Sequence, residues 1–242
     1  MNSYKNLAKW YDRLTKDVSY KEYVSFYESV FSESGDEVKL VLDLCCGTGS
    51  VTYELALRGY DLISCDSSAE MLSVAQSKCA MLERLPLFIC QDAAKIDLYG
   101  TVDAAVCALD SINYIPPDDL KSLFSRLKFF IRPGGLFIFD VNTPQLLKSA
   151  DGQTYIDEDD SIFCVWRADW SESEQCLVYG MDIFEKKNAL WSRSKEEHIE
   201  YAYDASQFVE LLTENSFELL STVIDTAFGG KGRQFYIAKR TE

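Results

Sequence analysis

The sequence of 242 residues contains a single histidine, His198, and only 24 lysines and arginines against 39 aspartates and glutamates. The resulting formal charge of −15 repels phosphate backbones and anionic membrane surfaces, and no compact basic stretch interrupts it. One histidine leaves a metal shell short of nitrogen ligands, and no two cysteines have the C-x-x-C spacing of a zinc or redox site. The composition therefore disfavours nucleic acid, membranes and metal as partners.

Long apolar stretches are also missing from the chain. Nowhere do the roughly eighteen apolar residues of a membrane-spanning helix follow one another, and residues 1–10 lack the pattern of a signal peptide. We therefore expect a soluble, cytoplasmic protein. In that compartment the eight cysteines stay reduced, and we interpret them as small core hydrophobes. With 47% hydrophobic residues, the chain can bury one substantial core in one domain with an insertion.

The hydrophobic pattern changes its period several times along the chain. Two amphipathic helices are expected first, over residues 4–14 and 20–31. Apolar runs at 38–44, 60–65, 86–91, 102–108 and 136–141 then alternate with helical stretches at about 50–58, 68–82 and 118–131. Near-continuous apolar strands of this kind are typical of a parallel sheet covered on both faces. The predicted fold class is α/β, with a Rossmann-like doubly wound sheet.

After Asn142 the pattern becomes a strict alternation of apolar and polar residues. It covers residues 162–170, 177–183 and 199–203 and predicts half-buried antiparallel strands with an aromatic underside. We interpret the acidic run 157–160 as a solvated loop. A helix over about 205–215 and strands at 218–227 and 234–239 complete the chain. The expected domains are a helical cap at 1–35, a Rossmann-like domain at 36–142 and 204–242, and an inserted antiparallel lid at 143–203.

A glycine turn follows the first predicted strand, where doubly wound sheets bind their ligands. It reads Asp43-Leu44-Cys45-Cys46-Gly47-Thr48-Gly49, and the helix that begins there offers free N–H donors. Asp66 closes the next strand, where a carboxylate can accept both hydroxyls of a ribose. Asp92 closes the third strand and can accept from an exocyclic amine. Each residue alone is an ordinary turn or cap residue, but in this order they describe an adenosine pocket.

The same turn argues against a dinucleotide cofactor. The NAD fingerprint requires a third glycine, and Thr52 stands at that position. Asp43 lies just before the turn, where it would repel a pyrophosphate but attract the ammonium of a bound amino acid. A ligand with a nucleoside and a cationic amine fits best, which favours S-adenosylmethionine. An oxidoreductase with a dinucleotide cofactor stays as an alternative.

These motifs resemble those of class I S-adenosylmethionine-dependent methyltransferases. The turn is similar to their first motif, Asp66 to the acid after strand two, Asp92-Ala93 to the pair after strand three, and Arg132-Pro133-Gly134-Gly135 to the turn before strand five. Cys45 departs from the pattern, which has glycine there, so the amine end of the site is expected to be narrower. Residues 11–14 and 110–114 further resemble small bacterial methyltransferases with an inserted antiparallel sheet, a group similar to sugar-amine N-methyltransferases.

The resemblance implies a terminal antiparallel hairpin around Gly229-Gly230 and a set of cofactor-binding residues. The set comprises Tyr11, Tyr20, Asp43, Cys45, Gly47, Thr48, Gly49, Asp66, Ser67, Met71, Asp92, Ala93, Leu109 and Asp110. The two tyrosines lie among polar residues of the N-terminal helices, which we expect to close the cofactor site. Their hydroxyls can reach the cofactor carboxylate, and their rings can lie against the sulfonium.

Methyl transfer from a sulfonium needs alignment of the acceptor and exclusion of water more than a catalytic dyad. In this family the loop after strand four borders the methyl group, which makes Asn113 and Tyr114 candidate catalytic residues. His198 is a third candidate, although a solvated strand face shared with Glu196 and Glu200 explains it more simply. We expect methyl transfer to N or O of a small molecule. An RNA methyltransferase and a catalytically silent S-adenosylmethionine-binding protein stay as alternatives.

Overall fold

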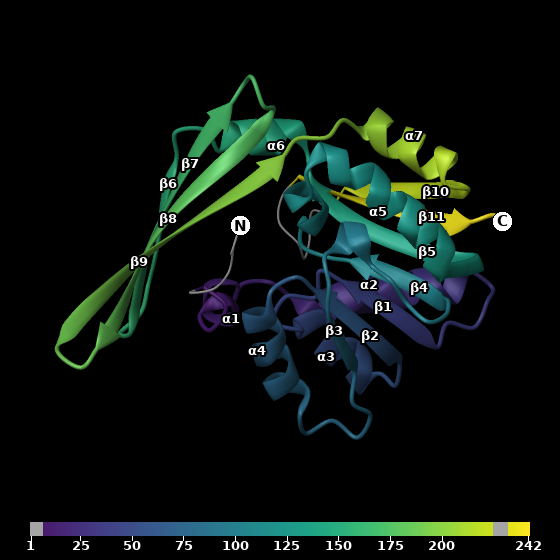
Figure 1. The fold of residues 1–242 in the computed structure, drawn as a ribbon, viewed down its shortest axis with the longest axis horizontal. Coiled ribbons are helices and arrows are strands. Elements are labelled where there is room, and N and C mark those ends of the chain that lie inside the picture. The colour runs from purple at the N-terminus through teal and green to yellow at the C-terminus, as the bar shows by residue number, and fades with distance from the viewer. Residues whose placement is uncertain (1–6, 225–231) are drawn as a thin grey trace.

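The computed structural model describes residues 7–224 and 232–242 (Figure 1). Its larger sheet consists, from edge to edge, of β10 (Phe217–Ile224), β11 (Arg233–Arg240), β5 (Ile131–Asn142), β4 (Val102–Cys107), β1 (Leu40–Leu44), β2 (Asp61–Asp66) and β3 (Leu87–Cys90). The strands β5, β4, β1, β2 and β3 run parallel to one another, whereas β11 runs antiparallel to both β5 and β10. This order confirms the predicted Rossmann-like sheet with a terminal antiparallel hairpin. Gly229-Gly230 and Tyr4 lie outside the described residues.

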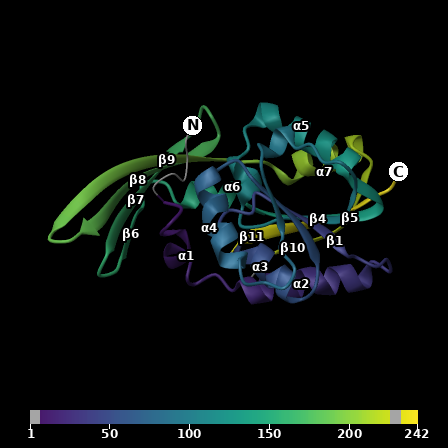
Figure 2. The same ribbon diagram turned by 60° about the horizontal axis from the view of Figure 1, so that its bottom comes forward.

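Helices cover both faces of this sheet, which explains why its strands are apolar almost throughout (Figure 2). On one face α5 (Pro117–Phe130) and α7 (Ala205–Glu214) pack against Leu42 and Phe139. On the other face α2 (Tyr20–Glu33) and α3 (Ser50–Leu57) pack against Val41 and Ile138. The carboxyl ends of β1 to β4 lead into α3, α4 (Ala69–Cys79) and the short helices η1 (Ala93–Lys95) and η2 (Ser111–Tyr114). These connections supply the candidate site.

The predicted insertion forms a separate sheet rather than an extension of the large one. Its antiparallel strands, in order, are β6 (Thr154–Glu158), β7 (Ile162–Ser171), β8 (Cys176–Lys187) and β9 (Leu190–Tyr201), and we call them the lid sheet (Figure 1). The acidic run was expected to be a loop, but its first two residues belong to β6. The short helix α6 (Pro144–Ser149), which the sequence analysis did not predict, connects β5 to the lid sheet.

The inner face of the lid sheet was predicted correctly for β7 and β8 but wrongly for β9. Ile162, Cys164 and Met181 are buried, as the alternation indicated. In β9, however, His198 stands opposite Tyr179 and Glu200 opposite Leu177, so both face inward. Each is only 3% exposed, which contradicts the solvated strand face. The apolar residues at 199 and 201 were expected to face inward. Polar groups of the large domain cover the inner face here, so the polar residues of β9 face inward instead.

The first helix is also shorter than its apolar pattern suggested. α1 (Tyr11–Leu14) is a single turn that follows a turn at residues 7–10. A helix this short is unstable without tertiary support, because too few hydrogen bonds offset the cost of its nucleation. Contacts with the rest of the molecule must therefore stabilise the helical conformation of α1.

Gly49 determines how closely α3 and α4 approach at the glycine turn. Its backbone is left-handed, with φ of +73°, and a Cβ there would lie 2.8 Å from the Cβ of Ala75 in α4. Gly152 has a similar φ of +69° but has nothing within 4 Å of its own Cβ position. An alanine at Gly152 would therefore introduce backbone strain alone, whereas an alanine at Gly49 would add steric overlap with α4.

We predict that Gly49→Ala destabilises the protein more than Gly152→Ala does. The Gly152 variant should lose about 1–2 kcal/mol through the left-handed backbone alone. The Gly49 variant should lose about 1–3 kcal/mol more, because the new methyl group overpacks against α4. Urea denaturation of both variants measures the difference, and equal losses would show that α4 yields without cost.

Candidate functional site

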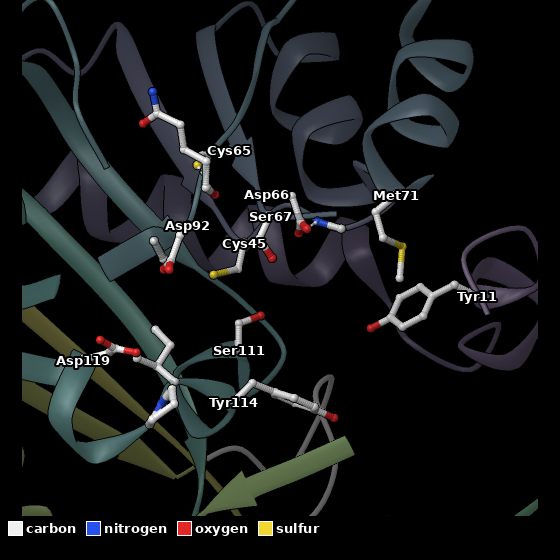
Figure 3. A pocket seen from close by; sticks show the side chains of 15 residues that line it. Tyr11, Cys45, Cys65, Asp66, Ser67, Met71, Asp92, Ser111, Tyr114 and Asp119 are labelled. Carbon is white, nitrogen blue, oxygen red and sulfur yellow. Dashed lines mark hydrogen bonds between the residues drawn. The ribbon is translucent and has the colours of Figure 1, made fainter. Parts of the chain in front are cut away.

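A cavity of about 350 Å³ opens at the carboxyl ends of the parallel strands (Figure 3). In that view Tyr11 lies at one end, and Asp92 and Asp119 lie at the other. Of the predicted site residues, its lining contains Tyr11, Cys45, Gly47, Asp66, Ser67, Met71, Asp92, Ala93 and Tyr114. Residues far apart in sequence thus meet at one sheet edge, as the strand order requires.

A second cavity of about 40 Å³ lies beside the first, against the glycine turn. Its lining contains the predicted residues Tyr11, Tyr20, Asp43, Cys45, Gly47, Thr48 and Leu109. The two cavities share Tyr11, Cys45, Gly47 and Ser111. One elongated ligand can therefore occupy both, with its larger part beside Asp66 and Asp92.

Asp66 holds the glycine turn to the end of β2. Its Oδ2 accepts from the N–H of Gly47 at 2.8 Å, and its Oδ1 accepts from the N–H of Ser68 at 2.8 Å. Each oxygen keeps a lone pair for a further donor from the cavity. Burial raises the pKa of this carboxyl above its usual value, and the backbone donors oppose the shift. Asp92 is more exposed; it accepts from Ala94 N–H at 3.0 Å and pairs with Lys95 at 3.1 Å.

Asp43 and Cys45 form the floor beneath the turn. The Thr52 hydroxyl donates to Asp43 Oδ2 at 2.5 Å, and burial raises the pKa of Asp43 to about 7. Cys45 has a left-handed φ of +57°, a conformation that glycine adopts without strain. Its thiol lies beside that of Cys107, and this contact and burial raise the pKa of Cys45 well above its usual value. Cys45 is therefore a neutral thiol at neutral pH.

The two N-terminal tyrosines reach the site from different elements. Tyr11 of α1 lines both cavities, whereas Tyr20 at the start of α2 lines only the smaller one. The Tyr20 hydroxyl lies 3.1 Å from Thr15 Oγ1. Burial raises the pKa of both phenols, so each stays neutral and can donate a hydrogen bond.

The three catalytic candidates have different surroundings. Tyr114 lines the large cavity, and its hydroxyl donates to Glu200 Oε1 at 3.1 Å. Asn113 donates to the carbonyls of Asn142 and Tyr201 and accepts from Asn142 N–H, so its amide is used to join the end of β9 to β5. His198 lies on the inner face of the lid sheet with Nε2 3.2 Å from Glu196, and its ring contacts Tyr114 edge-on. Only Tyr114 among them lines the cavity.

Gly49 and Asp110, which were predicted to bind the cofactor, lie outside the lining of both cavities. Gly49 allows the helices to approach, as described above. Asp110 pairs with Arg233 at 2.6 Å, and Arg233 also contacts Asp140 at 2.9 Å. Asp140 accepts from the N–H groups of Leu109 and Asp110, both at 2.9 Å, and so fixes two residues with left-handed backbones.

Sequence reasoning missed Glu200, Asp140 and Arg233. Glu200 was assigned to a solvated face, and the 93 positions between Asp140 and Arg233 hide their contact. Gln91, Ser111 and Asp119 of the cavity lining were also missed. Gln91 ends a predicted strand, Ser111 lies in the loop after another, and Asp119 lies at the start of a predicted helix. Within residues 7–224 and 232–242, no cluster of three or more metal-ligating side chains occurs, and no helix could cross a membrane.

Known proteins resemble this chain in sequence and in fold. A family model described as a methyltransferase domain matches residues 41–135. YqeM of Bacillus subtilis, named as a methyltransferase, is 28% identical over 92% of this chain and 89% of its own length. An S-adenosylmethionine-dependent methyltransferase from Clostridium acetobutylicum has a crystal structure that matches with a TM-score of 0.87 and 29% identity over 99% of both chains. CalS10 of Micromonospora echinaspora, an amino pentose methyltransferase with S-adenosylmethionine bound, shares the fold with a TM-score of 0.78 and 17% identity over 96% of both chains.

The raised pKa of Asp43 leads to a prediction about stability without ligand. This pKa is about 7 in the folded chain, against an ordinary value of 3.8. The native state therefore binds the proton more tightly, and the stability contributed by protonated Asp43 is fully present below about pH 4. That contribution is lost as the pH rises through 7. The shift of Asp66 has the same sign and adds to the trend.

We expect Asp43→Asn to flatten the decline of stability between pH 5 and pH 8 by about 2–3 kcal/mol, because the amide cannot ionise. The asparagine oxygen can still accept from Thr52. Denaturant unfolding at the two pH values measures the change. Asp61→Asn, at the exposed opposite end of β2, serves as the control and should keep the wild-type decline. An identical decline in the Asp43 variant would show that this carboxyl is ionised in the fold.

Proposed function

We propose that this chain, an S-adenosylmethionine-dependent methyltransferase, transfers the methyl group to a nitrogen or oxygen atom of a small molecule. The observation that supports this proposal is the contact between the lid sheet and the cavity. Glu200 on the inner face of the lid sheet is buried against Tyr114, which lines the cavity. An acceptor that reaches Tyr114 has to fit beneath the lid sheet, which favours a small molecule over a folded macromolecule.

The cavity residues fit the cofactor in one orientation. We assign the ribose to Asp66, whose carboxylate keeps lone pairs, and the adenine to the region of Asp92. The amino-acid part then lies in the smaller cavity beside Thr48 and above Asp43. When bound, S-adenosylmethionine supplies an electrophilic methyl group on its sulfonium. Tyr11 lines both cavities and would shield this end from water.

We assign the acceptor end of the site to Tyr114 and Glu200. The Tyr114 hydroxyl can orient the nucleophilic atom, while Glu200 accepts from Tyr114 at 3.1 Å and from Asn142 at 2.9 Å. Burial raises the pKa of Glu200, which makes it a better proton acceptor than an exposed carboxylate. With S-adenosylmethionine bound, the acceptor atom would bond to the methyl carbon as the bond from that carbon to sulfur breaks, leaving S-adenosylhomocysteine. The proton that the acceptor loses would pass through the Tyr114 hydroxyl to Glu200. His198, whose Nε2 lies 3.2 Å from Glu196, contacts the ring of Tyr114 from the lid side.

The charge of the chain favours this proposal over methylation of RNA. A net charge of −15 opposes the approach of a phosphate backbone.

All eight cysteines are free thiols, which supports a reducing compartment and hence the cytoplasm.

The proposal predicts where a radioactive methyl group goes. Purified protein is incubated with methyl-labelled S-adenosylmethionine and, separately, with the dialysable fraction, the RNA and the protein of a bacterial extract. We expect label to be transferred only into the dialysable fraction, because the lid sheet restricts access to the methyl group. Ribonuclease-sensitive label in the RNA fraction would overturn the small-molecule proposal.

With an acceptor in hand, Glu200→Gln should lower kcat by about 100-fold or more, since it removes a general base. The wild-type rate should rise with pH through the raised pKa of Glu200, and the variant should lose this dependence. Glu197→Gln changes the neighbouring, exposed residue of β9 and serves as the matched control. Equal kcat values and equal pH profiles for all three proteins would exclude Glu200 from proton transfer.

A further inference from the structure

A short N-terminal segment lies between the glycine turn and the lid sheet (Figure 1). We call residues 7–15 the strap; they include the single helical turn α1. Tyr11, at the centre of the strap, lines both cavities of the candidate site. The strap thus contacts both the large domain and the lid sheet. The backbone joins these two parts at the two ends of the lid insertion.

On the cofactor side, the carboxylate of Asp12 contacts both the glycine turn and α4. Its Oδ1 accepts from the Thr48 hydroxyl at 2.6 Å, and its Oδ2 pairs with Lys78 of α4 at 2.8 Å. Lys78 also donates to Ser50 at 2.6 Å, so the turn and both following helices meet at one carboxylate. Thr48 is 2% exposed and lines the smaller cavity. A ligand in that cavity therefore contacts Thr48, the residue whose hydroxyl donates to Asp12.

On the lid side, four polar contacts and an apolar cluster hold the strap. Arg13 contacts Asp159 at 3.1 Å and Ser161 at 2.8 Å, and Lys9 pairs with Glu185 at 2.5 Å. The N–H of Leu7 donates to Glu196 at 3.2 Å. Leu7 is buried among residues of β7 and β8, and Trp10, Tyr11 and Leu14 pack around it.

We propose that Asp12 is a positioning residue for cofactor binding, and that the strap transmits cofactor occupancy to the lid sheet. Ion pairs as exposed as these are individually weak, so the strap can open to admit a ligand. A ligand that contacts Thr48 and Tyr11 binds the closed strap more tightly than the open one, and so shifts the population towards closure. The closed strap in turn fixes the lid sheet through Leu7, Lys9 and Arg13.

This inference concerns the cofactor site alone and does not depend on which acceptor the enzyme methylates. Linkage makes the effect reciprocal, because a strap that stabilises the lid sheet when ligand is bound must also tighten ligand binding when the lid sheet is closed. S-adenosylhomocysteine suffices as the probe, since it contains the parts that reach Thr48 and Tyr11. A failure of the small-molecule proposal would leave the inference intact.

The experiment combines calorimetry with hydrogen–deuterium exchange on the full chain. In the wild type, S-adenosylhomocysteine should slow exchange in β7 and β8. Asp12→Ala should raise its Kd about fivefold or more, the range of ordinary couplings between sites. At saturating ligand, the variant should also lose the protection of the lid sheet. Asp61→Ala, which breaks the exposed pair with Arg84 at the far end of β2, should change neither quantity.

Two further variants separate positioning from a purely structural role. Asp12→Asn keeps an acceptor for Thr48 but loses the ion pair with Lys78, so its Kd should lie between those of the wild type and Asp12→Ala. A combined Lys9→Ala and Arg13→Ala variant should lose lid protection while retaining more affinity than Asp12→Ala. Wild-type affinity in Asp12→Ala, or full protection of its lid sheet at saturation, would overturn the inference.

Discussion

The hydrogen bond between Asp66 and the backbone of Gly47 is the contact around which the site is built. Parallel pairing of β1 and β2 brings a turn and a carboxylate to the same sheet edge, and this bond fixes the distance between them. The turn then presents Thr48 to the smaller cavity and to Asp12. Both cavities and the contact between Asp12 and Thr48 therefore depend on the pairing of β1 with β2.

Buried acids dominate the electrostatics of this sheet edge. Burial raises the pKa values of Asp43, Asp66, Asp140 and Glu200. Arg233 neutralises part of this charge by pairing with Asp110 and Asp140. A cationic ligand at this edge would gain attraction from the remaining carboxylates, which is consistent with a sulfonium cofactor.

The order of elements between residues 38 and 142 could be predicted because local hydrophobic periodicity sets the strands of a sheet buried on both faces. Asp66 and Asp92 were found for the same reason, since Asp66 ends β2 and Asp92 follows β3. The orientation of β9 could not be predicted, because Tyr114 and Asn142, which are distant in sequence, contact the inward-facing His198 and Glu200. The roles of Asn113 and Asp12 depend likewise on contacts made only after the whole chain has folded.

The strap has a consequence for the order in which a newly made chain acquires its function. Its bonds to the lid sheet join residues that are 146 to 189 positions apart. Synthesis proceeds from the N-terminus, so the strap leaves the ribosome well before its partners in the lid sheet are made. Arg233, which fixes the loop after β4 through Asp140, emerges later still. A nascent chain can therefore fold much of its sheet before its binding site is complete. Cofactor binding can stabilise the fold only after all of these segments have been made.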